Sequence, residues 1–405
     1  MKIRAITGFL DPGWPLDPDA IQIVASCMHE MREAFVQAGY EVQTLRLATP
    51  PPSEITAPVL PMDRPAFASD LEAQCFVHGI DYANVGPALP EEPEGYQIVP
   101  EILRAAEIIF CSGMYADPEI GLSIRAAEAC AEAILGASTV SPDGFTNLRF
   151  AALANVPPGG PFFPAAYHRG GRPAIAIATE SADLAVDSVT DSSSLATVRQ
   201  HLVTSIETHA GALTLAAEPI ANEHSIRFLG IDFSFAPFPE PERSLGTAIE
   251  ALSEAEAGLH GTVAGAAFLA DCLDQAQFQR TGFCGLFLPV LEDSVLAART
   301  ADRSLGLKDL LLLSTVCGGG LDTIPLPGDV DQNAVAALLI DLGALALRHD
   351  KPLTARLMPI PRKSAGDEIH FDFPYFADSR VMALPKQPLS ELWVSSGLLD
   401  LNRKL

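Results

Sequence analysis

Residues 227–239 read Arg227-Phe228-Leu229-Gly230-Ile231-Asp232-Phe233-Ser234-Phe235-Ala236-Pro237-Phe238-Pro239, which is an apolar strand closed by two prolines. Parallel strands in barrels and doubly wound sheets present their carboxyl ends to a ligand. We therefore expect Asp232, as a catalytic group, and Ser234, as a substrate contact, to lie in or beside a site. The alternative is structural, because a carboxylate here can also cap a turn or accept backbone N–H groups.

Outward from this strand, short β-rich runs alternate with longer segments of helical period. We expect strands at residues 3–10, 41–47, 107–111, 147–155, 174–179, 225–233, 284–289 and 353–359. We expect helices at 18–39, 98–106, 118–135, 195–210, 244–257, 262–274, 307–317 and 331–348. This alternation is typical of α/β proteins whose parallel strands are covered by helices. No repeat or shift in composition divides the chain, so we predict one α/β barrel domain over residues 1–405 rather than two domains.

The composition is acidic and apolar. The 405 residues include 26 Lys and Arg against 51 Asp and Glu, a formal charge of −25, and 48% are hydrophobic. A field of this sign repels phosphate backbones and anionic lipid headgroups, so nucleic acid and membranes are not expected as partners. The apolar run at 334–347 is interrupted by Asp341 and is shorter than the roughly 20 residues of a membrane span. At this size and apolarity, we expect a homo-oligomer.

The cysteines and the N-terminus point to the cytoplasm. The seven cysteines are odd in number, scattered and never arranged as C-x-x-C. Neither a disulfide framework nor a zinc ribbon fits this pattern, whereas reduced thiols do. The basic residues at the start precede only a short apolar stretch that ends at Asp11-Pro12, so we expect no secretory signal.

Two stretches suggest acid-base or metal chemistry. In Gly258-Leu259-His260-Gly261-Thr262, His260 lies at a predicted helix start, where it could act as general base, metal ligand or hydrogen-bond donor. The alternative is a loop histidine that caps the helix. Further along, Glu292 and Asp293 are candidate ligands of a divalent metal ion, the cofactor that the residues allow. Acidic residues in a first helical turn are, however, also what the helix dipole favours.

The stretch Cys317-Gly318-Gly319-Gly320-Leu321-Asp322 places a thiol, a glycine run and a carboxylate on one loop. It has neither the Lys-Ser/Thr of a Walker loop nor the G-x-G-x-x-G pattern, so phosphate binding is not favoured. Glycines such as Gly319 let a ligand approach the backbone closely. We therefore expect Gly319 and Asp322 to contact a substrate and Cys317 to be a candidate nucleophile.

Cys111 and His168 are two further candidates. Cys111 ends the strand predicted at 107–111, and as a nucleophile it would need a lowered thiol pKa. The alternative is that Cys111 is a small buried hydrophobe. His168 ends an aromatic loop that begins at Pro161 and is suited to walling a pocket, so we expect it to contact a substrate. No H-E-x-x-H or G-x-S-x-G signature occurs in the chain.

Several stretches together resemble the family called domain of unknown function 711, an uncharacterised protein family: Lys2-Ile3-Arg4-Ala5-Ile6-Thr7, Gly230 to Pro239, His260-Gly261-Thr262, Pro289 to Asp293 and Cys317 to Pro327. The fold of that family resembles pyruvate formate-lyase and anaerobic ribonucleotide reductase. The resemblance implies a ten-stranded α/β barrel made of two half-barrels, with the site inside. Those enzymes form a glycyl radical near the C-terminus, but Arg380-Val381-Met382-Ala383 has alanine where the glycine would be. Radical chemistry is therefore not expected.

The leading hypothesis for function is a non-radical enzyme that acts on a small metabolite inside the barrel. Asp232 and His260 would provide acid-base or metal-binding chemistry, and Cys317 or Cys111 would be a nucleophile. The basis is that these polar groups fall at predicted junctions between strands and helices. The alternative is a metabolite- or metal-binding protein without turnover, because no catalytic signature motif occurs.

Overall fold

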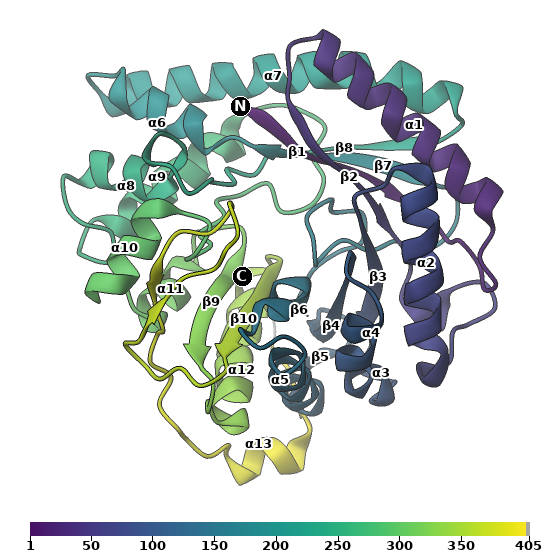
Figure 1. The fold of residues 1–405 in the computed structure, drawn as a ribbon. Helices are drawn as coiled ribbons and strands as arrows, with labels where there is room; N and C mark the ends of the chain where they lie inside the picture. Colours follow the sequence, from purple (N-terminus) through teal and green to yellow (C-terminus); the bar gives the residue numbers. More distant parts are fainter. Residues whose placement is uncertain (402–405) are drawn as a thin grey trace.

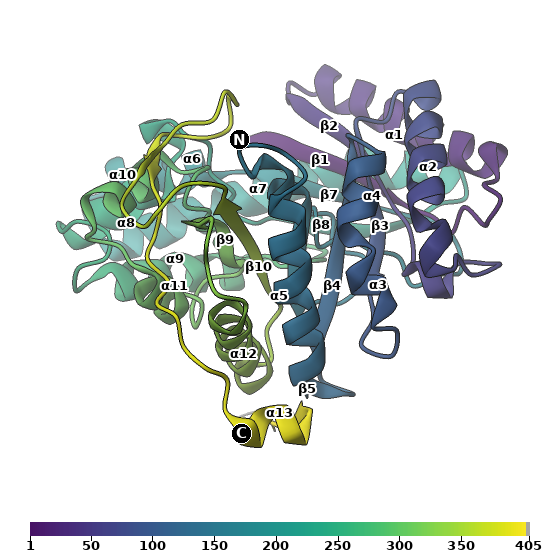
Figure 2. The same cartoon turned by 60° about the horizontal axis from the view of Figure 1, so that its bottom comes forward.

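The structure is a computed structural model and describes residues 1–401. It has mixed α/β architecture, with a large curled sheet at the centre and helices on its outer side (Figures 1 and 2). The class expected from the alternating pattern is confirmed. The arrangement of the strands places a pocket inside the curl of the sheet.

The first half of the chain supplies one parallel set of strands. The strands are β1 (Lys2–Phe9), β2 (Val42–Ala48), β3 (Tyr82–Ala88), β4 (Ile109–Asp117) and β6 (Phe150–Ala154). Each pairs in parallel with the next in this order. The helices between them are α1 (Pro18–Gln37), α2 (Arg64–His78), α3 (Glu94–Gln97), α4 (Val99–Ala105) and α5 (Ile124–Ser138).

The second half supplies two further parallel pairs. These are β7 (Ala174–Glu180) with β8 (Arg227–Asp232), and β9 (Gly320–Pro327) with β10 (Leu353–Ile360). β7 pairs antiparallel with β1, and β10 pairs antiparallel with β6. The helices here are α6 (Ala182–Thr190), α7 (Leu195–Glu223), α8 (Leu245–Ser253), α9 (Thr262–Gln275), α10 (Ser294–Asp302), α11 (Leu307–Leu313) and α12 (Gln332–His349). Within residues 1–401, the hydrogen-bonded path therefore runs β8-β7-β1-β2-β3-β4-β6-β10-β9.

Residues 280–289 lie between the two ends of this path. Arg280 and Leu286 form isolated parallel bridges with Ile231 and Phe235, at and just beyond β8. Pro289 forms another with Asp322 of β9. The sequence predicts a regular strand at 284–289, but the structure shows only these bridges. Two features interrupt a ladder: Cys284 has a positive φ of 42°, and proline has no backbone N–H to donate.

Local sequence explains why several of these elements form. α1 begins where the side chain of Asp17 accepts hydrogen bonds from the backbone N–H groups of Asp19 and Ala20, which caps the helix. Its apolar residues recur at helical spacing and are buried, as at Met28 and Phe35. The strands β6, β7, β9 and β10 are buried along their whole length, as expected for strands covered on both faces.

Several boundaries differ from the sequence-based expectation. The strands β3 and β9 and the helices α2 and α6 are not among the predicted elements. The helix expected at 118–135 begins only at Ile124, because residues 117–123 turn back at Gly121 to pair β5 (Gly121–Ser123) with β4. The helix expected to end at 210 continues to Glu223 and carries Pro219 in its last turns.

The C-terminal part lies along the outside of the sheet and reaches over its centre. Its elements are β11 (Glu368–Ile369), β12 (Ser379–Arg380), α13 (Glu391–Ser396) and β13 (Leu398–Leu399), which pairs with β5. Short 3-10 helices occur at η1 (Pro52–Glu54), η2 (Pro61–Asp63), η3 (Phe145–Arg149) and η4 (Pro241–Arg243). In the described part of the chain, no helix combines the length and apolarity needed to cross a bilayer.

Candidate functional site

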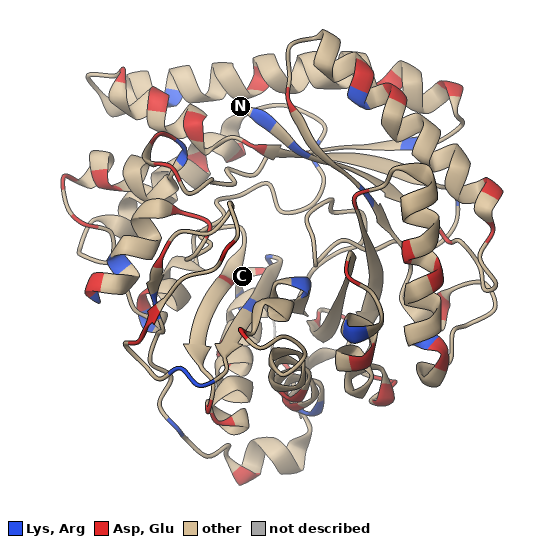
Figure 3. Ribbon diagram, in the orientation of Figure 1, with Lys and Arg blue, Asp and Glu red and all other residues tan. Residues whose placement is uncertain are grey.

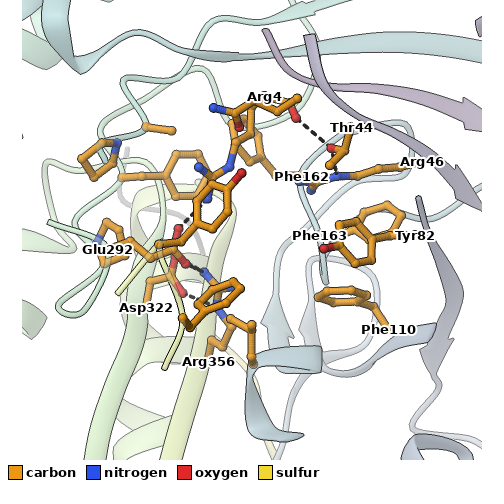
Figure 4. Close-up of a pocket in the computed structure, with 18 residues that line it drawn as sticks. Arg4, Thr44, Arg46, Tyr82, Phe110, Phe162, Phe163, Glu292, Asp322 and Arg356 are labelled. Carbon is orange, nitrogen blue, oxygen red and sulfur yellow. Dashed lines mark hydrogen bonds and ion pairs between the residues drawn. The ribbon is translucent and has the colours of Figure 1, made fainter. Parts of the chain in front are cut away.

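A pocket with charged and aromatic walls lies inside the curl of the sheet (Figure 4). Its empty space, including its mouth, is about 820 Å³. Side chains from β1, β2, β3, β4, β9 and β10 contribute to the walls, together with loops that follow other strands. The described residues that line it are Arg4, Gln43, Thr44, Arg46, Tyr82, Phe110, Leu148, Phe162, Phe163, Ala236, Pro237, Phe287, Pro289, Glu292, Asp322, Arg356, Phe373 and Tyr375.

One wall holds a buried ion pair with two contacts. Arg356 Nε lies 2.5 Å from Asp322 Oδ1, and Arg356 Nη2 lies 3.0 Å from Asp322 Oδ2. The same Nη2 donates to Glu292 Oε1 at 2.7 Å. The register between β9 and β10 shifts at this point, so that two residues of β9 oppose Arg356. Such bulges redirect side chains, and here the bulge brings Asp322 to Arg356.

Arg4 extends this network to the other half of the sheet. Its Nη2 donates to Glu292 Oε2 at 2.6 Å, and its Nη1 donates to Glu180 Oε2 at 2.8 Å. Arg243 pairs with the other oxygen of Glu180. Arg4 is the extra residue where the register of β1 against β7 shifts. The described side chains thus form an alternating series without net charge: Arg243, Glu180, Arg4, Glu292, Arg356 and Asp322.

Burial affects the pKa values of the central pair in opposite ways. It raises the pKa of the Asp322 carboxyl, and the neighbouring Arg356 guanidinium opposes that shift. Burial alone would lower the pKa of Arg356, but Asp322 and Glu292 hold it above its ordinary value. Short hydrogen bonds between two charged groups favour the ionised pair. This wall is therefore strongly polar while its charges cancel.

Arg46 is a lining cation outside the alternating series. Among residues 1–401, no carboxylate lies within ion-pair distance of its guanidinium, and its Nη atoms have no hydrogen-bond partner. Its Nε donates to Thr44 Oγ1 at 2.8 Å, and the rings of Tyr82 and Phe163 lie 5.8 and 5.2 Å from its Cζ. Burial, helped by Arg4, lowers the pKa of Arg46 to about 10. Arg46 is therefore still charged at neutral pH.

The charge of the pocket differs from that of the outer surface. Acidic residues are spread over the outer helices (Figure 3), in keeping with the formal charge of −25. The charged residues among the described pocket lining are three arginines, Arg4, Arg46 and Arg356, and two carboxylates, Glu292 and Asp322. The surplus charge inside is therefore positive, and its source is Arg46.

Glu292 and Asp322 are the sequence-predicted residues that line this pocket. Both are engaged by arginines. Asp293, the proposed metal partner of Glu292, faces elsewhere: its Oδ1 accepts from Val295 N at 3.0 Å and from Ser244 Oγ at 2.5 Å, which caps α10. Burial raises its pKa. In the part of the chain that the structure describes, no group of three or more His, Cys, Asp and Glu residues is placed to hold a metal ion.

Asp232 and Ser234 lie together, at and just beyond the end of β8, and neither belongs to the described lining of the pocket. Asp232 is fully buried and accepts from Ser234 Oγ at 2.6 Å, from Phe283 N at 2.7 Å and from Cys284 N at 2.9 Å. These bonds tie the end of β8 to residues 280–289. Burial raises the pKa of Asp232 to about 6, although the hydrogen bonds act in the opposite direction. The turn comes so close at Gly282, where φ is +70°, that a Cβ would lie 2.1 Å from Asp232 Oδ2.

The other catalytic candidates are not brought to this pocket. Cys111 is buried in β4, and burial raises its pKa to about 12, which is opposite to the shift that activates a thiol. Cys317 is buried just after α11, where its carbonyl accepts from Lys351 Nζ. His260 is exposed between α8 and α9. Asp232, His260, Cys317 and Cys111 are all absent from the described lining of the pocket.

His168 and Gly319 lie behind the pocket walls. His168 is 4% exposed, and its ring centre is 6.4 Å from that of Phe9. Burial lowers its pKa, so the neutral ring is favoured. At Gly319, a Cβ would lie 2.6 Å from the ring of Phe287, which lines the pocket. The absence of a side chain at Gly319 therefore sets where this wall stands.

Sequence reasoning missed the three arginines of the pocket. Arg4, Arg46 and Arg356 all lie within otherwise apolar runs that the sequence predicts as strands. A charged side chain in a strand covered by helices has to point to a polar interior or to a partner, because burying an unpaired charge is costly. A single arginine in each of three predicted core strands was the available signal.

Fold and site together define an α/β protein with an arginine-lined, aromatic pocket inside a curled sheet. The family model described as "Uncharacterised ACR (DUF711)" matches residues 1–378, and the chain belongs to this family. A UPF0210 protein of Pyrobaculum islandicum is 30% identical over 345 residues, covering 81% of this chain and 76% of the relative. A UPF0210 protein of Methanopyrus kandleri is 26% identical over 398 residues, covering 91% and 88%. One from Neisseria meningitidis is 24% identical over 347 residues, covering 82% and 77%.

Proposed function

We propose that this chain binds a small organic anion in the pocket, with Arg46 as the residue that holds the negative group. The observation that carries the proposal is the unpaired state of the Arg46 guanidinium among residues 1–401, next to an ion network without net charge. A cation inside a pocket is costly without a counter-charge, and a bound anion would supply one.

The fold proposal goes with this site. The sheet would be a closed ten-stranded α/β barrel of two half-barrels, resembling pyruvate formate-lyase, with residues 280–289 as the tenth strand. Two facts support it: the strands form two internally parallel groups joined by antiparallel pairs, and residues 280–289 bridge to β8 on one side and to β9 on the other. Alanine at position 383 continues to argue against a glycyl radical.

For the chemistry, we propose a non-radical enzyme that uses Asp322 or Glu292 for acid-base steps on the bound anion. Both carboxylates line the pocket, and burial raises the pKa of Asp322. Perturbed carboxyl groups in a pocket are candidates for such a role. One observation favours the alternative of binding without turnover, since both carboxylates are already paired with arginines.

The test compares anion binding by the wild-type chain and by Arg46 variants. Acetate, benzoate and inorganic phosphate are titrated by calorimetry at low ionic strength. Loss of a charge-assisted contact worth about 1.5–3 kcal/mol predicts roughly 10- to 100-fold weaker binding in Arg46→Gln, with partial recovery in Arg46→Lys. Arg104→Gln removes an exposed arginine away from the pocket and serves as control. If the wild type binds none of the anions, or Arg46→Gln binds them equally well, the proposal is refuted.

A second measurement separates an enzyme from a binding protein. An anion that binds is incubated with the protein, with and without added Mg²⁺ or Zn²⁺, and is followed by one-dimensional proton NMR. Consumption that Asp322→Asn abolishes supports the enzyme, while stabilisation without consumption supports the binding protein.

Participation of Cys111, Cys317 or His260 in turnover is tested by substitution. Cys111→Ser, Cys317→Ser and His260→Gln change residues outside the described pocket lining. If any of the three takes part in turnover, its replacement will lower the rate while leaving anion affinity unchanged. The seven cysteines all lie within the described residues and all are free, which supports the proposal of a reducing compartment such as the cytoplasm.

A further inference from the structure

We infer that the anion is the single carboxylate of a flat, aromatic acid, bound end-on by Arg46 Nη1 and Nη2. This inference rests on the proposed function and narrows its ligand. It has three independent parts: the shape of the free cation, the absence of further anion-binding elements, and the aromatic character of the walls.

The shape of the free cation matches a carboxylate. Thr44 Oγ1 accepts from Arg46 Nε at 2.8 Å and in turn donates to the carbonyl of Arg4 at 2.8 Å. Thr44 therefore fixes the guanidinium and occupies its Nε edge. The remaining edge offers two parallel N–H donors, one from each Nη, which is the spacing of the two oxygens of a carboxylate. In Figure 4, Arg46 lies across the pocket from Glu292 and Asp322.

A phosphate or a second carboxylate fits this pocket poorly. None of the described lining residues is a lysine or glycine, and none belongs to an α-helix, so the helix N-termini and glycine loops that commonly hold phosphates do not contribute. A dianion would carry one charge more than Arg46 can balance. A second carboxylate reaching across the pocket would meet Glu292 and Asp322, whose arginine partners are already shared. The pocket thus suits one negative charge.

The walls suit a flat ring. Seven of the 18 described lining residues are aromatic, against 7% in the whole chain, so the enrichment is specific to the pocket. Next to Arg46, Tyr82 and Phe110 meet edge to face at 5.4 Å, and so do Phe110 and Phe163. Aromatic rings add specific contact energy to each other beyond the area they bury. A planar acid would gain these contacts, while a saturated ring of the same size would gain only burial.

The experiment compares matched ligands on the intact wild-type chain. Benzoate, cyclohexanecarboxylate, terephthalate and phenyl phosphate are ranked by saturation-transfer NMR and calorimetry. We expect benzoate to bind about fivefold more tightly than cyclohexanecarboxylate, from the extra ring contacts, and more tightly than either dianion. Phe163→Leu keeps the wall apolar and is expected to reduce the preference for benzoate, with a thermal melt confirming that the variant is folded.

The outcomes separate this inference from the function on which it rests. Equal affinity for benzoate and cyclohexanecarboxylate would overturn the aromatic part and leave anion binding intact. Tighter binding of terephthalate or phenyl phosphate would overturn the single carboxylate. If none of the four ligands binds while acetate or inorganic phosphate does, this inference fails and the proposed function stands; if acetate and inorganic phosphate do not bind either, the proposed function itself fails.

Discussion

The substitution Glu292→Gln tests the ion network directly. Glu292 is 6% exposed and lies between two arginines, with contacts of 2.6 Å to Arg4 and 2.7 Å to Arg356. Glutamine has the same size but no charge, and its amide oxygen can accept only as a neutral group. The network would then carry a net positive charge in a pocket that already contains Arg46.

The size of the effect follows from the contacts that change. Two charge-assisted hydrogen bonds contribute about 1.5–3 kcal/mol each, and a neutral acceptor can retain about 1 kcal/mol for one of them. Arg4 keeps Glu180 and Arg356 keeps Asp322, so neither cation is left without a partner. We therefore expect a loss of about 3 kcal/mol in the free energy of unfolding, at the lower end for breaking a buried ion pair.

The assay is equilibrium unfolding in urea, followed by tryptophan fluorescence and circular dichroism. Glu368→Gln is the matched control, because Glu368 pairs with Arg380 while its side chain is 79% exposed. An exposed pair contributes about 0–1 kcal/mol, so the control is expected to stay close to the wild type. A loss for Glu292→Gln that is below about 1 kcal/mol, or no larger than that of the control, would refute the idea that these charges form one interdependent network.

Three further predictions concern single contacts. Burial raises the pKa of Asp232 from 3.8 to about 6, so the folded state binds the proton more tightly than the unfolded state, and the stabilising contribution of the protonated group is lost as pH rises through 6. The free energy of unfolding of the wild type, relative to that of Asp232→Asn, should therefore fall by up to about 3 kcal/mol between pH 4 and pH 6.5. A difference between the two proteins that does not change with pH in urea titrations would contradict this. Gly282→Ala would bring a Cβ to 2.1 Å from Asp232 Oδ2, so it should lower the melting temperature. Gly171→Ala is the control, because Gly171 has a similar positive φ but a Cβ there would meet nothing within 4 Å, so the melting temperature should fall far less. Equal decreases for the two variants would show that backbone strain alone matters. Thr44→Val removes the hydroxyl that accepts the hydrogen bond from Arg46 Nε. It should weaken anion binding about three- to tenfold and lower the free energy of unfolding by about 1 kcal/mol. An unchanged affinity in calorimetry would show that Thr44 does not position Arg46.

The candidate site shows where sequence reasoning works and where it stops. The sequence singles out Asp232, because a carboxylate at the end of an apolar strand needs partners. Which partners it has depends on residues about 50 positions away, Phe283 and Cys284, and no local pattern encodes that contact. Glu292 and Asp322 reach the pocket, whereas Asp293, next to one of them, caps a helix.

The α/β class, the family and many of the strands and helices follow from the sequence alone, because period, caps and turn residues act over a few neighbouring positions. The site depends on contacts between distant parts of the chain. Arg356 lies more than 300 residues along the chain from Arg4 and Arg46, and shifts in strand register accompany the contacts by which Arg4 and Arg356 share Glu292. Whether an arginine is paired or free depends on which side chains share its low-dielectric surroundings, and that is set by the packing of the whole sheet.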